Sequence, residues 1–99
     1  MTIAVFNKGK FVDFWLNEPT EKTWVDRTIA AKGWLRQDVE VYLYELNRDG
    51  SEVLSFDAEK NLQKIKIEES EIDGVIVPMV SIEQTYNKIP LYLNGSFQG

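Results

Sequence analysis

The residues with the most evident chemical potential are four closely spaced acids followed by a glycine: Glu68, Glu69, Glu71, Asp73 and Gly74. The spacing of two among Glu69, Glu71 and Asp73 matches the oxygen ligands of a calcium loop. A complete loop needs further ligands and a later bidentate glutamate, and residues 75–80 provide none. A calcium site is therefore the weakest of three interpretations, and the sequence predicts no metal.

The other two interpretations of the acidic run remain open. In one, the acids are solvated residues of a loop between two strands, where water screens like charges. In the other, they belong to an anionic face that meets a basic partner, because concentrated charge steers association and selects partners. The second interpretation predicts these acidic partner-binding residues: Glu68, Glu69, Glu71, Asp73, Glu52, Asp57 and Glu59.

Catalytic residue types are scarce in this chain. It has no histidine and no cysteine, so the commonest general base, the thiolate nucleophile and the usual transition-metal ligands are missing. Neither a nucleophile elbow nor a glycine-rich phosphate or dinucleotide motif is present. The sequence therefore predicts a protein that is not an enzyme and that uses no cofactor.

The net charge of −5 is confined to one segment. Residues 1–44 contain six acids and six bases, residues 45–73 contain nine acids and four bases, and residues 74–99 contain one of each. A phosphate-backbone binder needs clustered Lys and Arg, so direct binding to nucleic acid is not expected. The middle segment is where we expect the function.

Aromatic side chains are the second excess, with three Trp and four Tyr. Most should be core residues of a small domain, although Trp15, Trp34 or the tyrosines could stack on a carbohydrate. Tyr42 and Tyr44 share one face of a predicted strand, and Tyr is enriched at interface hot spots. They complete the predicted partner-binding set as a half-exposed surface, unless a sheet packed under a helix buries them.

The elements that would position these residues are mainly strands. Residues 2–6 and 10–16 form a first hairpin around residues 7–9, and the second of these strands should be buried on both faces except near Asp13. Residues 39–46 and 51–56 form another hairpin around residues 47–50. Residues 64–67 alternate Lys and Ile, which predicts one buried and one wet face. A turn at Asp73 and Gly74 leads to residues 75–82, where Pro78 indicates an edge strand or a bulge. Residues 89–93 form a last strand.

One helix is expected over residues 20–32. Thr20 can cap it, Lys32 and Gly33 close it, and Val25 and Ile29 form its apolar stripe. An extended strand is the competing interpretation of this segment. Together these elements predict an α+β fold, mostly antiparallel β-sheet built from hairpins, with an all-β sandwich or barrel as the alternative.

Length and composition predict a single domain over residues 1–99. The absence of cysteine and the short apolar run at residues 3–6 favour a cytoplasmic location without a signal peptide or membrane span. No membrane partner is expected.

We expect a small acidic intracellular inhibitor of the immunity or antitoxin type, of bacterial origin, which neutralises a basic toxin or nuclease by covering its active site. Nucleases have basic clefts, for which an acidic patch is a natural competitor. The alternatives are a structural or assembly subunit of a phage or secretion system, and a carbohydrate-binding β module.

Overall fold

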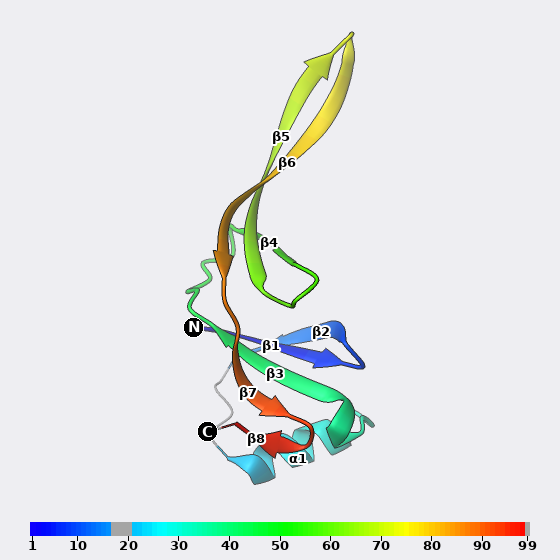
Figure 1. Ribbon diagram of the computed structural model, residues 1–99, viewed down its shortest axis with the longest axis vertical. Helices are drawn as coiled ribbons and strands as arrows, with labels where there is room; N and C mark the ends of the chain where they lie inside the picture. Colours follow the sequence, from blue (N-terminus) through cyan, green and yellow to red (C-terminus); the bar gives the residue numbers. More distant parts are fainter. Residues whose placement is uncertain (17–20, 99) are drawn as a thin grey trace. The chain divides into compact units, whose positions relative to one another are not determined.

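The computed structural model describes residues 1–16 and 21–98 (Figure 1). These residues form mostly antiparallel β-sheet with one short α-helix, as the sequence predicts. It divides into two compact units, one made of Met1–Asn47 and Lys88–Gly99 and the other of Arg48–Asn87. The single-domain assignment stays a prediction. Within the described ranges, no helix is long and apolar enough to cross a membrane.

The first unit contains a five-stranded sheet in the order β2-β1-β3-β7-β8. Its strands are β1 (Thr2–Asn7), β2 (Lys10–Trp15), β3 (Val39–Tyr44), β7 (Ile89–Leu93) and β8 (Ser96–Phe97). The expected first hairpin is confirmed by the β1–β2 pairing. β1 is buried from Thr2 to Phe6, and its Ile3 and Val5 belong to the core cluster that also contains Val25 and Ile29 of the helix region.

The expectation that β2 is buried on both faces is wrong. Residues 10–13 of β2 are exposed, and residues 14–15 are only partly buried. β2 is the edge strand of its sheet, so its aromatic and β-branched residues report strand propensity rather than burial.

The predicted helix is confirmed as α1 (Lys22–Ala31). Val25 and Ile29 are its two buried residues, and both belong to the core, together with residues of β1, β3 and β7. The Thr20 cap lies outside the described residues. A three-residue 3-10 turn, η1 (Arg36–Asp38), leads from the helix region into β3.

The C-terminus of α1 closes as the sequence predicts. The Gly33 N–H donates to the Ala30 carbonyl (3.0 Å) and the Trp34 N–H to the Ile29 carbonyl (3.2 Å). These two bonds form a Schellman motif, which needs a left-handed residue after the helix, and Gly33 has φ 77°.

A polar cluster ties α1 to β7 within the first unit. The Tyr92 hydroxyl donates to Asp26 Oδ1 (2.9 Å), while Lys22 Nζ lies 2.5 Å and an Arg36 guanidinium nitrogen 3.5 Å from Asp26 Oδ2. The hydrogen bond from Lys22 lowers the pKa of Asp26. Burial, followed by the hydrogen bond to Asp26, raises the pKa of Tyr92 to about 12.

The second unit contains a three-stranded antiparallel sheet in the order β4-β5-β6. Its strands are β4 (Val53–Phe56), β5 (Leu62–Ile72) and β6 (Val75–Tyr86). The predicted hairpin between residues 39–46 and 51–56 is wrong, because β3 and β4 belong to different sheets. β4 pairs instead with the following strand, β5. β6 is an edge strand, as Pro78 indicates.

Candidate protein-binding surface

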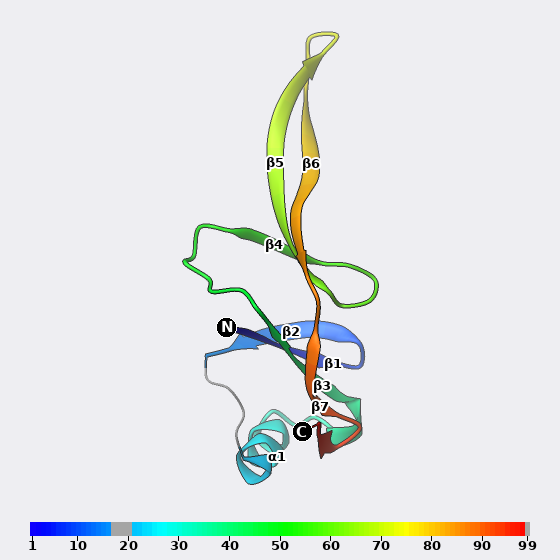
Figure 2. The same cartoon turned by 60° about the vertical axis from the view of Figure 1, so that its left-hand side comes forward.

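The most unusual feature of the second unit is the part of the β5–β6 hairpin that extends past β4. β4 pairs with β5 only from Leu62 to Ile65, whereas β5 and β6 remain paired up to Ile72 and Val75. Figure 2 shows the two strands continuing together beyond β4. We call this two-stranded extension, residues 65–82, the arm.

The sequence dictates the hairpin at the end of the arm. Asp73 and Gly74 have φ 51° and 79°, the two positive values of a type I′ turn, whose twist matches that of the flanking strands. Asp-Gly is one of the few dipeptides that favour this turn. The expected turn is therefore confirmed, and it sets the register in which Ile72 lies opposite Val75.

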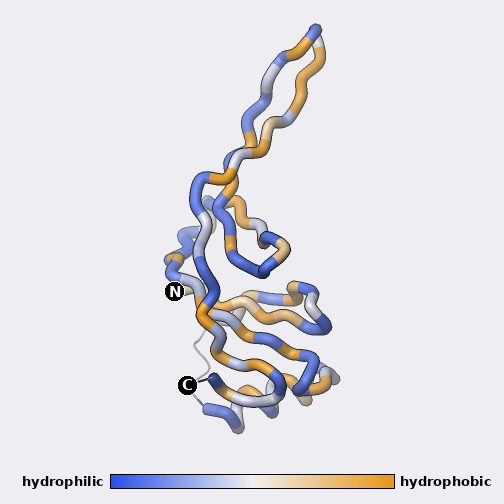
Figure 3. The backbone as a smooth tube through the Cα atoms, in the orientation of Figure 1, coloured by the Kyte–Doolittle hydropathy of each residue, from blue (hydrophilic) through white to orange (hydrophobic). Residues whose placement is uncertain are grey.

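Seven apolar side chains of the arm are each more than half exposed. They are Ile67, Ile72, Val75, Ile76, Met79, Val80 and Ile82. In Figure 3, β6 is mostly orange along the arm, whereas β5 beside it is bluer. Such a concentration of apolar surface in one element is characteristic of an interaction site.

The apolar residues lie on both faces of the arm. Directly opposed residues share a face. The register therefore defines an Ile67 face with residues 65, 67, 69, 71, 76, 78, 80 and 82. It also defines a Met79 face with residues 66, 68, 70, 72, 75, 77, 79 and 81. The predicted buried face of residues 64–67 is wrong for Ile67, which is 54% exposed.

The acids of the arm lie on β5 and not in a loop. Glu69 and Glu71 are on the Ile67 face, Glu68 is on the Met79 face, and Asp73 is in the turn. The interpretation of this run as a loop between strands is therefore wrong for the three glutamates. Lys66 Nζ lies 2.8 Å from a Glu68 carboxylate oxygen, and this hydrogen-bonded pair raises the pKa of Lys66 and lowers that of Glu68.

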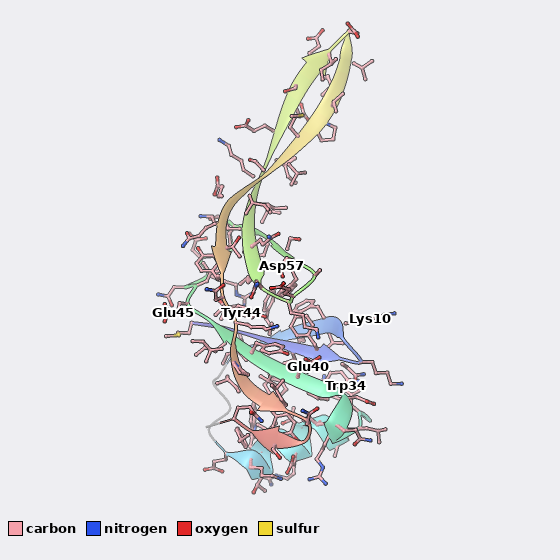
Figure 4. The ribbon with its side chains drawn as sticks, viewed as in Figure 1. Lys10, Trp34, Glu40, Tyr44, Glu45 and Asp57 are labelled. Carbon is pink, nitrogen blue, oxygen red and sulfur yellow. The ribbon has the colours of Figure 1, made fainter. Side chains whose placement is uncertain are left out.

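The remaining predicted acids lie elsewhere in the second unit. The Glu52 carboxylate precedes β4 and accepts the Asp49 N–H (3.2 Å). Asp57, in the loop between β4 and β5 (Figure 4), accepts the backbone N–H groups of Glu59 (2.9 Å) and Asn61 (2.8 Å). This loop joins β5 at Leu62, ten residues along the strand from Ile72, or roughly 33 Å at about 3.3 Å per residue. The seven acids therefore do not form one compact patch.

The predicted half-exposed surface of Tyr42 and Tyr44 is wrong. Tyr44 is fully buried and Tyr42 is 4% exposed. The Tyr42 hydroxyl also donates to the Glu40 carboxylate, and its ring packs edge-on against Phe6. Burial, followed by that hydrogen bond, raises the pKa of Tyr42. These are the properties of structural tyrosines. They alternate along β3 with Val41 and Leu43, which pack with Val25 and Ile29 of α1, so the two tyrosines lie on the face of the sheet that the helix does not cover.

The tryptophans offer little flat surface for a sugar. Trp15 and Trp34 are partly buried against the core, and Trp15 meets Trp24 edge-on with ring centroids 5.3 Å apart. A hollow of about 320 Å³ lies beside them, lined in part by Asp13, Thr28 and Lys32. Because the edge of one indole faces the plane of the other in this pair, one ring face is covered and cannot stack on a sugar.

Within the residues that the structure describes, no three acids gather closely enough to hold a metal ion. Glu69 and Glu71 lie along an extended strand, which does not wrap around a cation as a calcium loop does. Comparison with protein-family models, curated proteins and solved structures finds no match to this chain. The arm is therefore the feature of the chain that points to a function.

Sequence reasoning missed the apolar half of this surface. In the stretch VIVPMVSI at residues 75–82, seven of eight side chains are apolar, which is typical of a strand buried on both faces. That signal was present in the sequence. What the sequence does not show is that the strand lies at the edge of an uncovered two-stranded extension.

Proposed function

We propose that this chain is a non-catalytic protein-binding module that docks on a basic partner protein through its arm. In the form we favour, it is an intracellular inhibitor of the immunity or antitoxin type that covers the active site of a basic toxin or nuclease. The single observation that supports docking is the exposure of apolar side chains on both faces of the arm.

The arm is poorly suited to stand alone in water. A two-stranded hairpin is marginally stable by itself, and each square ångström of apolar surface removed from water contributes about 25 cal/mol. A partner that covers both faces of the arm removes its apolar residues from water and restricts the hairpin at the same time. Binding therefore supplies the burial that β6 lacks in the free chain.

The charge of the second unit supports a basic partner. Arg48–Asn87 contains nine acids and four bases, and the remaining residues balance at seven of each. An acidic, partly apolar projection is suited to a cleft that is apolar inside and lined with Lys and Arg. The cleft of a nuclease has such a basic lining because it must hold phosphates.

A structural or assembly subunit is the second candidate, because an exposed arm can equally reach a neighbouring subunit. We also assign the α+β class, on the packing of Val25 and Ile29 of α1 into the core. A cytoplasmic location is proposed on the absence of cysteine from the sequence.

The test compares arm variants for capture of a partner from the lysate of the source organism. Val80→Thr with Ile82→Thr changes the Ile67 face, and Val75→Thr with Met79→Thr changes the Met79 face. Because these side chains are already exposed, the free energy of unfolding should change by less than about 0.5 kcal/mol. We expect each pair to reduce partner affinity by at least about tenfold, since about 1.4 kcal/mol of lost burial suffices.

Leu35→Ser is the matched control, because Leu35 is 58% exposed but lies in the first unit. It should leave capture unchanged. A partner that is retained equally by both arm pairs, or one lost with Leu35→Ser alone, would exclude the arm as the docking element. If the chain associates with itself in the absence of any partner, and the double variants of the arm abolish this association, the assembly role is favoured instead.

A further inference from the structure

The two edges of the arm differ in their capacity to accept another strand. No other described strand pairs with β6 on its outer side, or with β5 beyond Ile65 on the side where β4 lies. Both edges therefore present unpaired backbone groups, which are templates for strand addition. Which groups they present follows from the turn.

The type I′ turn fixes the hydrogen-bonding pattern of the arm. In a two-residue turn, the closing pair is hydrogen bonded, and in an antiparallel ladder such pairs alternate with pairs that are not. Ile72–Val75 is the closing pair. The alternation then makes Glu71–Ile76, Glu69–Pro78 and Ile67–Val80 the non-bonded pairs, whose N–H and C=O groups point away from the hairpin.

This pattern interrupts the β6 edge. Pro78 lies in the middle of that edge, at a position whose nitrogen points outward, and proline has no N–H to donate. A strand added to β6 would lose a hydrogen bond at its centre and meet the pyrrolidine ring. On β5, Ile67, Glu69 and Glu71 all retain outward N–H and C=O groups. Only the β5 edge is continuous.

We infer that the β5 edge, residues 66–72, accepts an extended segment of the partner protein that bears lysine or arginine, as a strand continuing the line of β4. This inference rests on the proposed function and specifies how the partner is held. Seven residues at about 3.3 Å each give an edge of roughly 23 Å, within the range of ordinary strands. β4 already occupies the adjoining positions of the same edge, up to Ile65.

Charge selects this occupant over a second copy of the chain. Residues 66–75 contain four acids and one base. Two β5 edges paired with each other would bring acids of one copy beside acids of the other, and like charges in cross-strand positions are destabilising. A segment with Lys or Arg at alternate positions would instead lie beside Glu69 and Glu71 on the Ile67 face. The same acids thus favour a basic strand and disfavour self-pairing.

Amide hydrogen exchange, measured by NMR on the full chain, tests the inference. The probe is a short peptide that alternates valine and lysine, and its control alternates valine and glutamate. Strand addition at β5 should slow exchange of the outward amides of Ile67, Glu69 and Glu71 by at least about tenfold with the lysine peptide. The amides of Ile76 and Val80, on the β6 edge, should be unaffected.

Two proline variants provide a second measurement. Glu71→Pro removes an outward donor from β5, and Val80→Pro removes one from β6, so neither deletes a hydrogen bond within the arm. We expect Glu71→Pro to weaken binding of the lysine peptide by at least about fivefold, the equivalent of one lost hydrogen bond of about 1 kcal/mol. Val80→Pro should leave it within about twofold.

Unprotected β5 amides, protection at Ile76 and Val80 instead, or equal binding of the glutamate peptide would each overturn the inference. The proposed function has a separate test. It fails if the two double variants of the apolar faces still capture the partner as wild type does. A partner that requires the apolar faces but leaves the β5 amides unprotected would preserve the proposed function and exclude strand addition.

Discussion

At the scale of single residues, the contact between Tyr92 and Asp26 should stabilise the first unit. Tyr92 is fully buried, and its hydroxyl donates to a carboxylate that also pairs with Lys22 and Arg36. Tyr92→Phe leaves the ring packing intact and removes this bond, so the free energy of unfolding should fall by about 1.5 kcal/mol, measured by urea denaturation at neutral pH. Tyr86→Phe is the matched control. The Tyr86 hydroxyl donates to the exposed Gln84 side chain (3.0 Å), so its loss should cost under about 0.5 kcal/mol.

The same contact should make the difference between wild type and Tyr92→Phe depend on pH. The folded chain lowers the pKa of Asp26 below its ordinary value of 3.8, mainly through the Lys22 hydrogen bond. The stabilisation is therefore fully present above 3.8 and is lost as the pH falls through the lower folded-state pKa. The free energies of unfolding of wild type and Tyr92→Phe should therefore converge only at the acid end of this pH range, below the folded-state pKa of Asp26. A difference that stays constant down to that end would show that the Tyr92 hydroxyl contributes to stability independently of the charge on Asp26.

At the scale of elements, two glycines with nearly equal φ should respond differently to the same substitution. Gly33 (φ 77°) ends α1, and Gly74 (φ 79°) lies in the turn of the arm; a Cβ at either would meet no atom within 4 Å. Alanine at each position therefore incurs only the backbone penalty, about 1 kcal/mol. Gly33→Ala should lower the free energy of unfolding of the first unit by that amount, because α1 contributes Val25 and Ile29 to the core.

Gly74→Ala should act locally instead. We expect faster amide exchange of Ile72 and Val75, which close the turn, with no change in the stability of the first unit. The two variants are compared by thermal denaturation and by residue-resolved exchange. Equal loss of global stability in both would show that the arm unfolds together with the core, and not by separate opening.

Local signals in the sequence predicted most elements correctly, and long-range pairing accounts for the failures. The four-residue spacing of Val25 and Ile29, close to one helical turn, and the Asp73-Gly74 turn are encoded within a few residues, and both are confirmed. The pairing of residues 39–46 with residues 51–56 is wrong because two strands joined by a turn-like sequence need not belong to one sheet. The same limitation applies to the candidate site. Its acids could be identified from residue type alone, whereas the exposure of β6 and the burial of Tyr44 depend on how the strands are arranged in the sheets.

At the scale of the whole molecule, the separation of charge between the units should govern association with a basic partner. Met1–Asn47 and Lys88–Gly99 are balanced, so the net charge of −5 belongs to Arg48–Asn87, which includes the arm. Long-range attraction accelerates encounter and is screened by salt, whereas apolar burial is short-ranged and governs dissociation. The association rate should therefore fall by about tenfold or more between roughly 20 mM and 500 mM salt, with much less change in the dissociation rate.

Neutralising acids on the arm should reduce this salt dependence. Glu68→Gln, Glu69→Gln and Glu71→Gln together remove three negative charges, and reversal of the same three to lysine should weaken binding further. The matched control removes three exposed acids from the balanced unit, as Asp13→Asn, Glu21→Gln and Glu45→Gln. Association with the captured partner is measured by stopped flow at several salt concentrations. The association rate should depend less steeply on salt for the triple variant of the arm than for wild type, and the control triple variant should behave like wild type. If both triples lower the slope equally, net charge and not its position on the arm steers the encounter, and if neither does, the partner is not basic.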